Sequence, residues 1–125
     1  MLLPSRGVSN VSTPSPLEKL EAAFSDTSGV YVNQGVDEKT YFADLVSDIR
    51  SHISVPFEIN AQVTPPGFPD REIGSMVSGI CVAHSAGYWL VYQPEQDTFY
   101  CFWGTNPAEL QAPGIFGSAL YCWSA

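Results

Sequence analysis

The feature that most constrains the fold is the segment from Gly87 to Gly104, where two aromatic and β-branched runs flank a short polar stretch. The runs are Tyr88–Tyr92 and Thr98–Trp103, and Gln93–Asp97 lies between them. This pattern predicts a β-hairpin at the centre of a sheet. Both faces of the hairpin are apolar when successive residues are assigned to opposite sides. We therefore expect cover on both faces: helices on one, and another layer, a ligand or a partner protein on the other.

Two helices are predicted ahead of this hairpin. Ser15-Pro16-Leu17-Glu18 has the residues of a capping box and starts a helix that runs to about Ser25. A longer helix begins after Asp37, because apolar residues recur there at helical spacing: Tyr41, Phe42, Leu45, Val46, Ile49 and Ile53. We expect this second helix to cover one face of the hairpin.

Three more segments read as strands. Ser54–Val63 alternates apolar and polar residues, Met76–His84 leads into the hairpin, and Ile115–Trp123 is too apolar to lie free in water. Between the first two, Thr64–Glu72 contains three prolines and is predicted to be a semi-rigid surface loop that exposes Phe68.

These elements predict an α+β domain with an antiparallel sheet of four to six strands and the two N-terminal helices packed on one face. We expect this single domain to span residues 15–125 and residues 1–14 to form a flexible tail, since Ser, Pro, Asn and Thr occur there without periodicity.

The charge balance narrows the choice of partners. Thirteen acidic residues against five basic ones give a net charge of −8, which repels nucleic acid and anionic membranes. A basic protein is the expected partner, because opposite charges speed and orient association. No run approaches the roughly 18 apolar residues of a membrane span, and the start of the chain lacks the apolar core of a signal peptide. We therefore expect a cytoplasmic protein.

The cysteines and histidines form no decisive catalytic or metal-binding pattern. Cys81 and His84 project to opposite faces of a strand, so we expect no metal site and no cofactor. The odd number of cysteines, all in apolar runs, favours buried thiols. We assign no catalytic residue and favour a binding role over enzymatic activity. The alternative is a small-molecule-binding domain or small enzyme that uses Cys81 or His84 in an aromatic pocket lined by Trp89, Trp103 and Tyr121.

Recognition residues are expected among acids and large aromatic side chains. Asp44 and Asp48 share one helix face, and loop tips commonly carry binding residues. Aromatic side chains dominate many binding sites, although a packed aromatic core is the alternative. The candidate partner-binding residues are Asp44, Asp48, Phe68, Asp70, Glu72, Glu95, Asp97, Tyr100 and Trp103.

The order of elements also resembles a known group of proteins. An acidic chain with helices first, then aromatic strands ending in Gly-Tyr-Trp-Leu-Val-Tyr and Thr-Phe-Tyr-Cys-Phe-Trp, resembles the immunity proteins that neutralise bacterial toxins and, more distantly, the SUKH group. The resemblance implies a non-enzymatic inhibitor that occludes a toxin's active cleft with an acidic, aromatic surface. A homodimer formed through an exposed sheet face is a further alternative.

Overall fold

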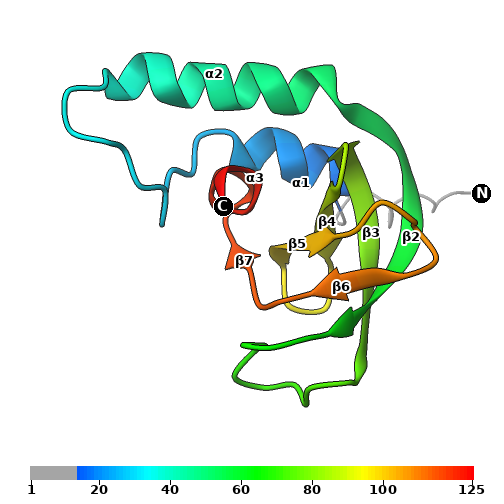
Figure 1. Cartoon of the computed structure of the whole chain (residues 1–125). Helices are drawn as coiled ribbons and strands as arrows, with labels where there is room; N and C mark the ends of the chain where they lie inside the picture. Colours follow the sequence, from blue (N-terminus) through cyan, green and yellow to red (C-terminus); the bar gives the residue numbers. More distant parts are fainter. Residues whose placement is uncertain (1–13) are drawn as a thin grey trace, which may run out of the picture.

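The computed structural model describes residues 14–125, in which helices pack against a curled sheet (Figure 1). The tail predicted for residues 1–14 lies, apart from Pro14, outside the described residues. The α+β class is confirmed, with two helices ahead of the sheet. In chain order the elements are α1 (Pro16–Ala23), α2 (Glu38–Ser51), β2 (Ile53–Val63), β3 (Met76–Ser85), β4 (Tyr88–Gln93), β5 (Thr98–Trp103), β6 (Leu110–Ala112), β7 (Phe116–Gly117) and α3 (Ala119–Ser124).

Both N-terminal helices begin where their caps predict. The Ser15 hydroxyl accepts from the Glu18 amide at 3.2 Å, and the Glu18 carboxylate accepts from the Ser15 amide at 2.8 Å. The Asp37 carboxylate accepts from the Thr40 amide at 3.1 Å and so satisfies one free donor of α2. Since these signals are local, the sequence locates the helix starts without knowledge of the rest of the fold.

The central hairpin is confirmed as β4 and β5. The two strands pair antiparallel along their whole length, from Tyr88 opposite Trp103 to Gln93 opposite Thr98. Asp97 closes the turn with a φ of 51°, a left-handed conformation that Asp tolerates better than most residues.

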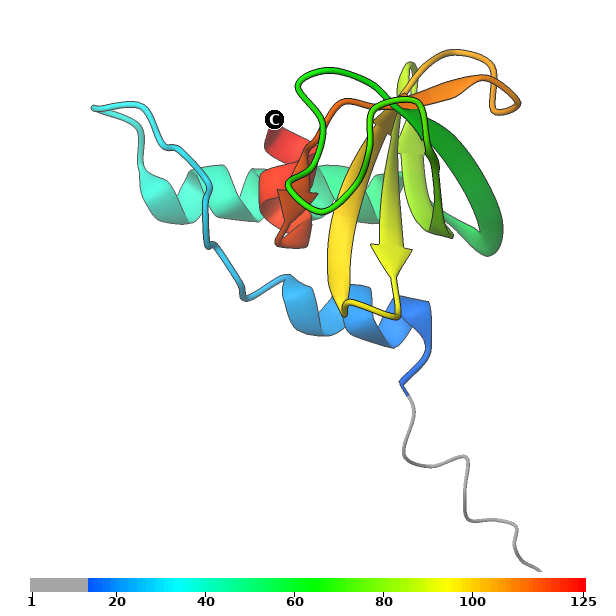
Figure 2. The same ribbon diagram turned by 90° about the horizontal axis from the view of Figure 1, so that it is seen from below.

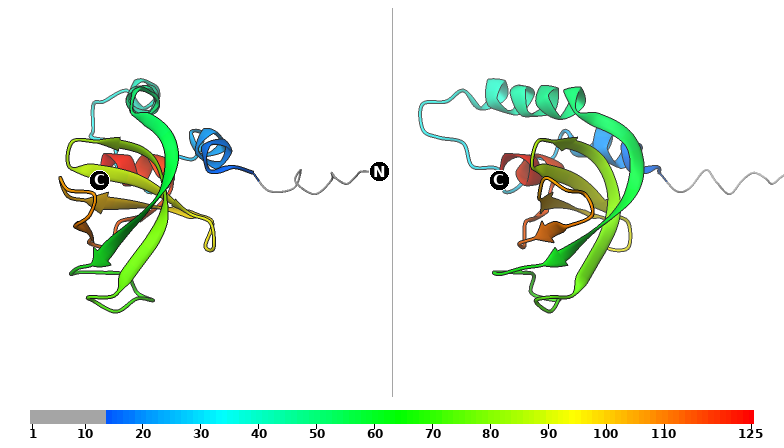
Figure 3. Two further views of the ribbon diagram at one scale, coloured as in Figure 1. Left: turned by 90° about the vertical axis from the view of Figure 1, so that its right-hand side faces the viewer. Right: turned by 45° about the vertical axis from the view of Figure 1, so that its right-hand side comes forward.

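The sheet is mixed and closes on itself, which the sequence did not predict. Antiparallel pairings join β2 to β3, β3 to β4, β4 to β5 and β5 to β6. The ring is completed by a parallel pairing of β6 with β2, from Ala61 opposite Leu110 to Val63 opposite Ala112. Closure depends on the curvature of β2, whose far end turns across the sheet to reach β6 (Figure 3). Five strands thus form a small barrel, and β7 adds to the edge of β5.

Both apolar faces of the hairpin are covered by other parts of the same chain. On the outer face, Leu90, Tyr92, Phe99 and Cys101 pack against buried side chains of the three helices, among them Leu20, Ile49, Leu120 and Trp123. The inner face is covered by the barrel's other strands, and its largest fully buried rings are Tyr100 and Phe102. The second layer is therefore the sheet itself.

The strand predicted over Ile115–Trp123 is mostly wrong. Only Phe116–Gly117 is extended, and the chain then turns into α3. The Ser118 hydroxyl caps this helix by accepting from the Tyr121 amide at 3.2 Å. The run is apolar because α3 is buried on nearly all sides between α2 and the sheet, not because it is a strand.

Candidate functional site

A pocket lies where the proline-rich loop crosses one end of the barrel. The loop, residues 64–75, passes beside β7 and β5 (Figure 2). It is anchored by the Gly67 amide, which donates to the Pro113 carbonyl at 2.9 Å. The Phe68 ring packs on the Tyr100 ring, with centroids 5.1 Å apart, and on the Phe116 ring at 5.6 Å. The prediction that this loop exposes Phe68 is wrong, because the side chain is only 7% exposed and packs into the inner core of the barrel.

We call the adjoining hollow the loop pocket. Its volume is about 600 Å³, and it is formed by Phe68, Pro69, Asp70, Gln96, Thr98, Tyr100 and Phe116. Three of these, Phe68, Asp70 and Tyr100, belong to the predicted recognition set. Tyr100 contributes from a position that is 1% exposed, whereas the Phe116 ring is 43% exposed. The pocket thus combines a rigid aromatic floor with one accessible ring.

A chain of hydrogen bonds fixes the two loops that border the loop pocket. The Tyr100 hydroxyl donates to Gln96 Oε1 at 2.5 Å, and Gln96 Nε2 donates to Asp70 Oδ2 at 3.0 Å. Arg71 Nη2 donates to the Tyr100 hydroxyl at 3.2 Å. Because Gln96 comes from the hairpin loop and Asp70 from the proline-rich loop, this chain holds the Asp70 carboxylate in place at the pocket wall.

Carboxylates lie on both of these loops. Asp70, Glu72 and Glu95 are exposed, and no Lys or Arg of residues 14–125 forms an ion pair with them. Asp97 differs, because it lies 2.9 Å from Lys19 Nζ and accepts from the Tyr92 hydroxyl at 2.6 Å. The hydrogen bonds from Tyr92 and Lys19 hold the pKa of Asp97 below its usual range. Asp97 therefore links α1 to the hairpin.

The remaining predicted residues lie away from the loop pocket. Asp44 and Asp48 are on α2, at the opposite end of the molecule from the proline-rich loop (Figure 1). The Asp48 carboxylate accepts from Trp123 Nε1 at 2.8 Å, so it serves α3. Trp103 is 43% exposed and ends β5 opposite Tyr88. It therefore lies at the end of the hairpin that is farthest from the hairpin loop. The nine predicted residues thus do not form one surface.

The thiols are unsuited to nucleophilic catalysis. Burial raises the pKa of Cys81 and of Cys101 to about 11, and it raises the pKa of Cys122 well above its usual value. All three therefore stay protonated at neutral pH. The prediction that Cys81 and His84 project to opposite faces is wrong, because the register of β3 with β4 shifts between Cys81 and Ala83. Cys81 faces the barrel core, and His84 lies on the same side, stacked on Trp89 with ring centroids 4.6 Å apart. Trp89 belongs to that inner core and Tyr121 to the helix side, so the aromatic pocket predicted around them does not form.

We expect all three thiols to react slowly with Ellman's reagent in the native protein. Each is buried and protonated, whereas the reagent needs an accessible thiolate. Three equivalents should be released rapidly once guanidinium unfolds the chain. A fast equivalent from the native protein would show that one of these cysteines lies at a surface.

Within residues 14–125 no group of three or more His, Cys, Asp or Glu side chains is arranged to hold a metal ion. None of the described helices is both long and apolar enough to cross a membrane. Comparison with protein-family models, curated proteins and solved structures found no match for this chain. Its function must therefore be inferred from its own geometry.

Sequence reasoning missed several members of the site. Gln96 links the two loops, Arg71 bonds to Tyr100, and Phe116 provides the accessible ring. Phe116 lies in the one part of the predicted final strand that is extended, and nothing in the sequence indicates that residues 64–75 and 94–97 meet. No local pattern marks Phe116 as exposed, since it follows apolar Ile115 without alternation of apolar and polar residues.

Proposed function

We propose that this chain is a non-enzymatic protein-binding domain that docks a basic protein partner at the loop pocket, as an immunity-type inhibitor does. The observation that carries the proposal is the placement of the exposed Phe116 ring in the same pocket as the Asp70 carboxylate, which has no ion-pair partner within the described part of the chain. This combination fits a partner side chain with an aliphatic stem and a cationic end.

The apolar part of the loop pocket is suited to binding because it is already ordered. Phe116 packs against Phe68 and, edge on, against Tyr100 at a centroid distance of 6.5 Å. Its ring loses little freedom when a partner covers it, so most of the gain from burying it contributes to affinity. The floor beneath is part of the barrel core and cannot yield easily.

The charge around the loop pocket favours a basic partner. Lys19 is paired with Asp97, and Arg50 is paired with Glu21 and lies on α2, at the opposite end of the molecule from the proline-rich loop (Figure 1). Arg71 donates to the neutral Tyr100 hydroxyl, with its guanidinium carbon 5.8 Å from the ring centroid, so it keeps its charge and offsets one of the three acids. Asp70, Glu72 and Glu95 form no ion pair within residues 14–125, so the two loops remain acidic, and the net charge of −8 steers a basic protein toward the chain.

The inhibitor role is the specific form of binding that these features support best. An inhibitor that occludes a cleft needs a preformed surface, and the bond from Gln96 to Asp70 holds two loops together before any partner arrives. The resemblance to toxin-neutralising immunity proteins points in the same direction, since toxins that act on nucleic acid are themselves basic.

The binding function can be tested by selecting phage-displayed random peptides on the full chain at low salt. We expect selected peptides to carry Lys or Arg next to an apolar residue, and their binding to weaken as salt rises. Phe116→Ala and Asp70→Asn should each weaken binding about tenfold, or about 1.4 kcal/mol. Asp44→Asn on α2 is the matched control and should change nothing. Selected peptides without basic residues, or full binding by Phe116→Ala, would contradict the proposal.

The inhibitor role needs a separate experiment. Products of the genes that flank this one are expressed alone and together with the chain, and growth of the host is measured. We expect one product to stop growth, the chain to restore it, and the double variant Phe116→Ala/Asp70→Asn to fail. If no flanking product impairs growth, or if the double variant protects fully, the inhibitor role at this site is wrong.

A further inference from the structure

Strand β2 leaves half of one edge without a neighbouring strand. Its pairing with β3 extends from Ile53 to Gln62, but its parallel pairing with β6 covers only Ala61–Val63. Within the described chain, residues 53–60 therefore have no strand on the β6 side. An edge of this kind presents main-chain donors and acceptors that a further extended chain can satisfy.

Only part of this edge is regular enough to accept a strand. The register with β3 shifts between Ile53 and Phe57, and Pro56 interrupts the run of main-chain donors. Bulges and prolines are common means of preventing indiscriminate pairing at sheet edges. They confine the accessible stretch to Phe57–Asn60, where the register with β3 is continuous.

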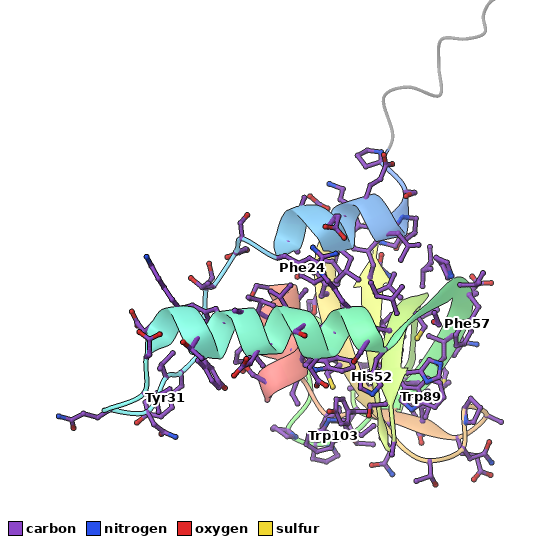
Figure 4. All side chains as sticks on the ribbon, turned by 90° about the horizontal axis from the view of Figure 1, so that it is seen from above. Phe24, Tyr31, His52, Phe57, Trp89 and Trp103 are labelled. Atoms are coloured by element: carbon purple, nitrogen blue, oxygen red, sulfur yellow. The ribbon has the colours of Figure 1, made fainter. Side chains whose placement is uncertain are left out.

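A groove runs beside this stretch. Its volume is about 680 Å³, and the segment 107–111 forms the opposite wall. Phe57, which is 37% exposed, lies on the inner face of β2 with Ile59, whereas Met76, which is 62% exposed, lies on the outer face with Glu58. The Phe57 ring is held edge on against Trp89 at a centroid distance of 6.5 Å (Figure 4). The groove thus has main-chain groups along one side and, on the inner face, one fixed apolar ring that alternate residues of an extended chain can contact.

The acidic residues that line this groove favour a basic segment over a second copy of the chain as its occupant. Glu58 lies on the β2 wall and Glu109 on the opposite wall, and both are exposed. No Lys or Arg of residues 14–125 lines the groove. A second copy of this chain, also at −8, would bring its own Glu58 toward this one in a two-fold edge pairing, which like charges oppose. A basic segment meets no such opposition.

We propose that the Phe57–Asn60 edge of β2 binds an extended, basic segment of a protein partner, which adds a strand in the groove between β2 and residues 107–111. The main chain of the segment pairs with the β2 edge. Its Lys or Arg side chains lie on the outer face near Glu58, with Glu109 on the opposite wall, and its alternate apolar side chains lie on the inner face beside Phe57. This site is separate from the loop pocket and goes beyond the function proposed for that pocket.

The test uses a capped six-residue peptide of alternating Lys and Val, added to the ¹⁵N-labelled full chain and followed by amide chemical shifts and hydrogen exchange. Amide shifts should change within residues 57–60 and 107–111, and exchange of the edge amides should slow. A peptide of alternating Glu and Val should have no effect. The same Lys-Val peptide with alternate N-methylated amides should also fail, because its charge is unchanged but its main chain can no longer pair.

Two variants of the chain complete the test. Glu58→Lys/Glu109→Lys should weaken binding of the Lys-Val peptide about tenfold. Asp44→Lys, which also reverses an exposed acid, should leave binding unchanged, as should Phe116→Ala in the loop pocket. Equal binding of the N-methylated peptide, or shift changes mapped elsewhere, would overturn the proposal. So would a concentration-dependent mass with protection of residues 57–60, which would make a second copy the occupant.

Discussion

Replacing Phe102 with alanine is expected to lower the free energy of unfolding by about 3–5 kcal/mol. Phe102 is 0% exposed and faces the inside of the barrel, where its ring lies 6.2 Å from that of Tyr100. The side chains around it come from strands that the closed ring holds in place, so the structure cannot easily collapse into the space left behind. Urea unfolding followed by tryptophan fluorescence measures the loss, and an unchanged m-value would show that the unfolding transition is comparable.

The adjacent residue is the matched control for this variant. Trp103 is larger than Phe102, but it lies on the other face of β5 and is 43% exposed. Trp103→Ala should therefore cost less, about 1–2 kcal/mol, because less of the removed surface was buried. If Trp103→Ala proved the more destabilising of the two, the assignment of the hairpin faces to the barrel interior and exterior would be wrong.

Replacing Gly114 with alanine is expected to destabilise the chain by about 3–4 kcal/mol. Gly114 has a φ of +119°, which a side chain strains, and an added Cβ would overlap the backbone carbonyl oxygen of Gly67. The two backbone segments cannot move apart freely, since the Gly67 amide donates a hydrogen bond to the Pro113 carbonyl at the base of the loop. Thermal and urea unfolding measure the loss. Loss of amide protection in residues 64–75 would locate it at the proline-rich loop.

Gly35→Ala separates the two causes of this destabilisation. Gly35 has a comparable φ of +89°, but nothing lies within 4 Å of the position that its Cβ would take. Gly35→Ala should therefore lower the free energy of unfolding only by the cost of a left-handed conformation, about 1–2 kcal/mol. Equal losses in the two variants would mean that Gly114 and Gly67 do not approach each other closely, and that the loop pocket is less rigid than described.

The parts of the fold that the sequence predicts well are those with local signals. Ser15 and Asp37 mark helix starts because a cap acts on the next three residues. The two hairpin strands are also marked locally, because their residues alternate between the two faces on either side of the turn that joins them. The closure of the sheet has no such signal. It depends on Ala61–Val63 meeting Leu110–Ala112, and three residues are too few for a periodic pattern to show.

Apolar character alone also misled the prediction at the end of the chain. The run from Ala119 is buried on nearly every side, and a buried helix and a buried strand have the same composition. Ser118 decides between them, because its hydroxyl caps the helix. A capping residue within an apolar run was thus more informative than the run itself.

Some of the predicted recognition residues come together in the structure, and their role in binding stays a prediction. Phe68, Asp70 and Tyr100 do line one pocket, as acids and aromatic residues near loops suggested. Asp48 and Asp97 instead bond to Trp123 and Lys19, respectively. Spacing in the sequence shows which acids share a face or a loop, but it does not show which of them have a partner elsewhere in the same chain.

Closure of the sheet into a barrel covers the second hairpin face, so this face needs no ligand or partner protein to cover it. It is tested most directly by nuclear Overhauser contacts in the labelled full chain. The structure predicts short contacts between residues 61–63 and 110–112 in parallel register, and between Trp103 and Gln111. An open antiparallel sheet, without those contacts and with fast-exchanging amides at residues 110–112, would contradict it and would leave the inner hairpin face to be covered by a ligand or partner.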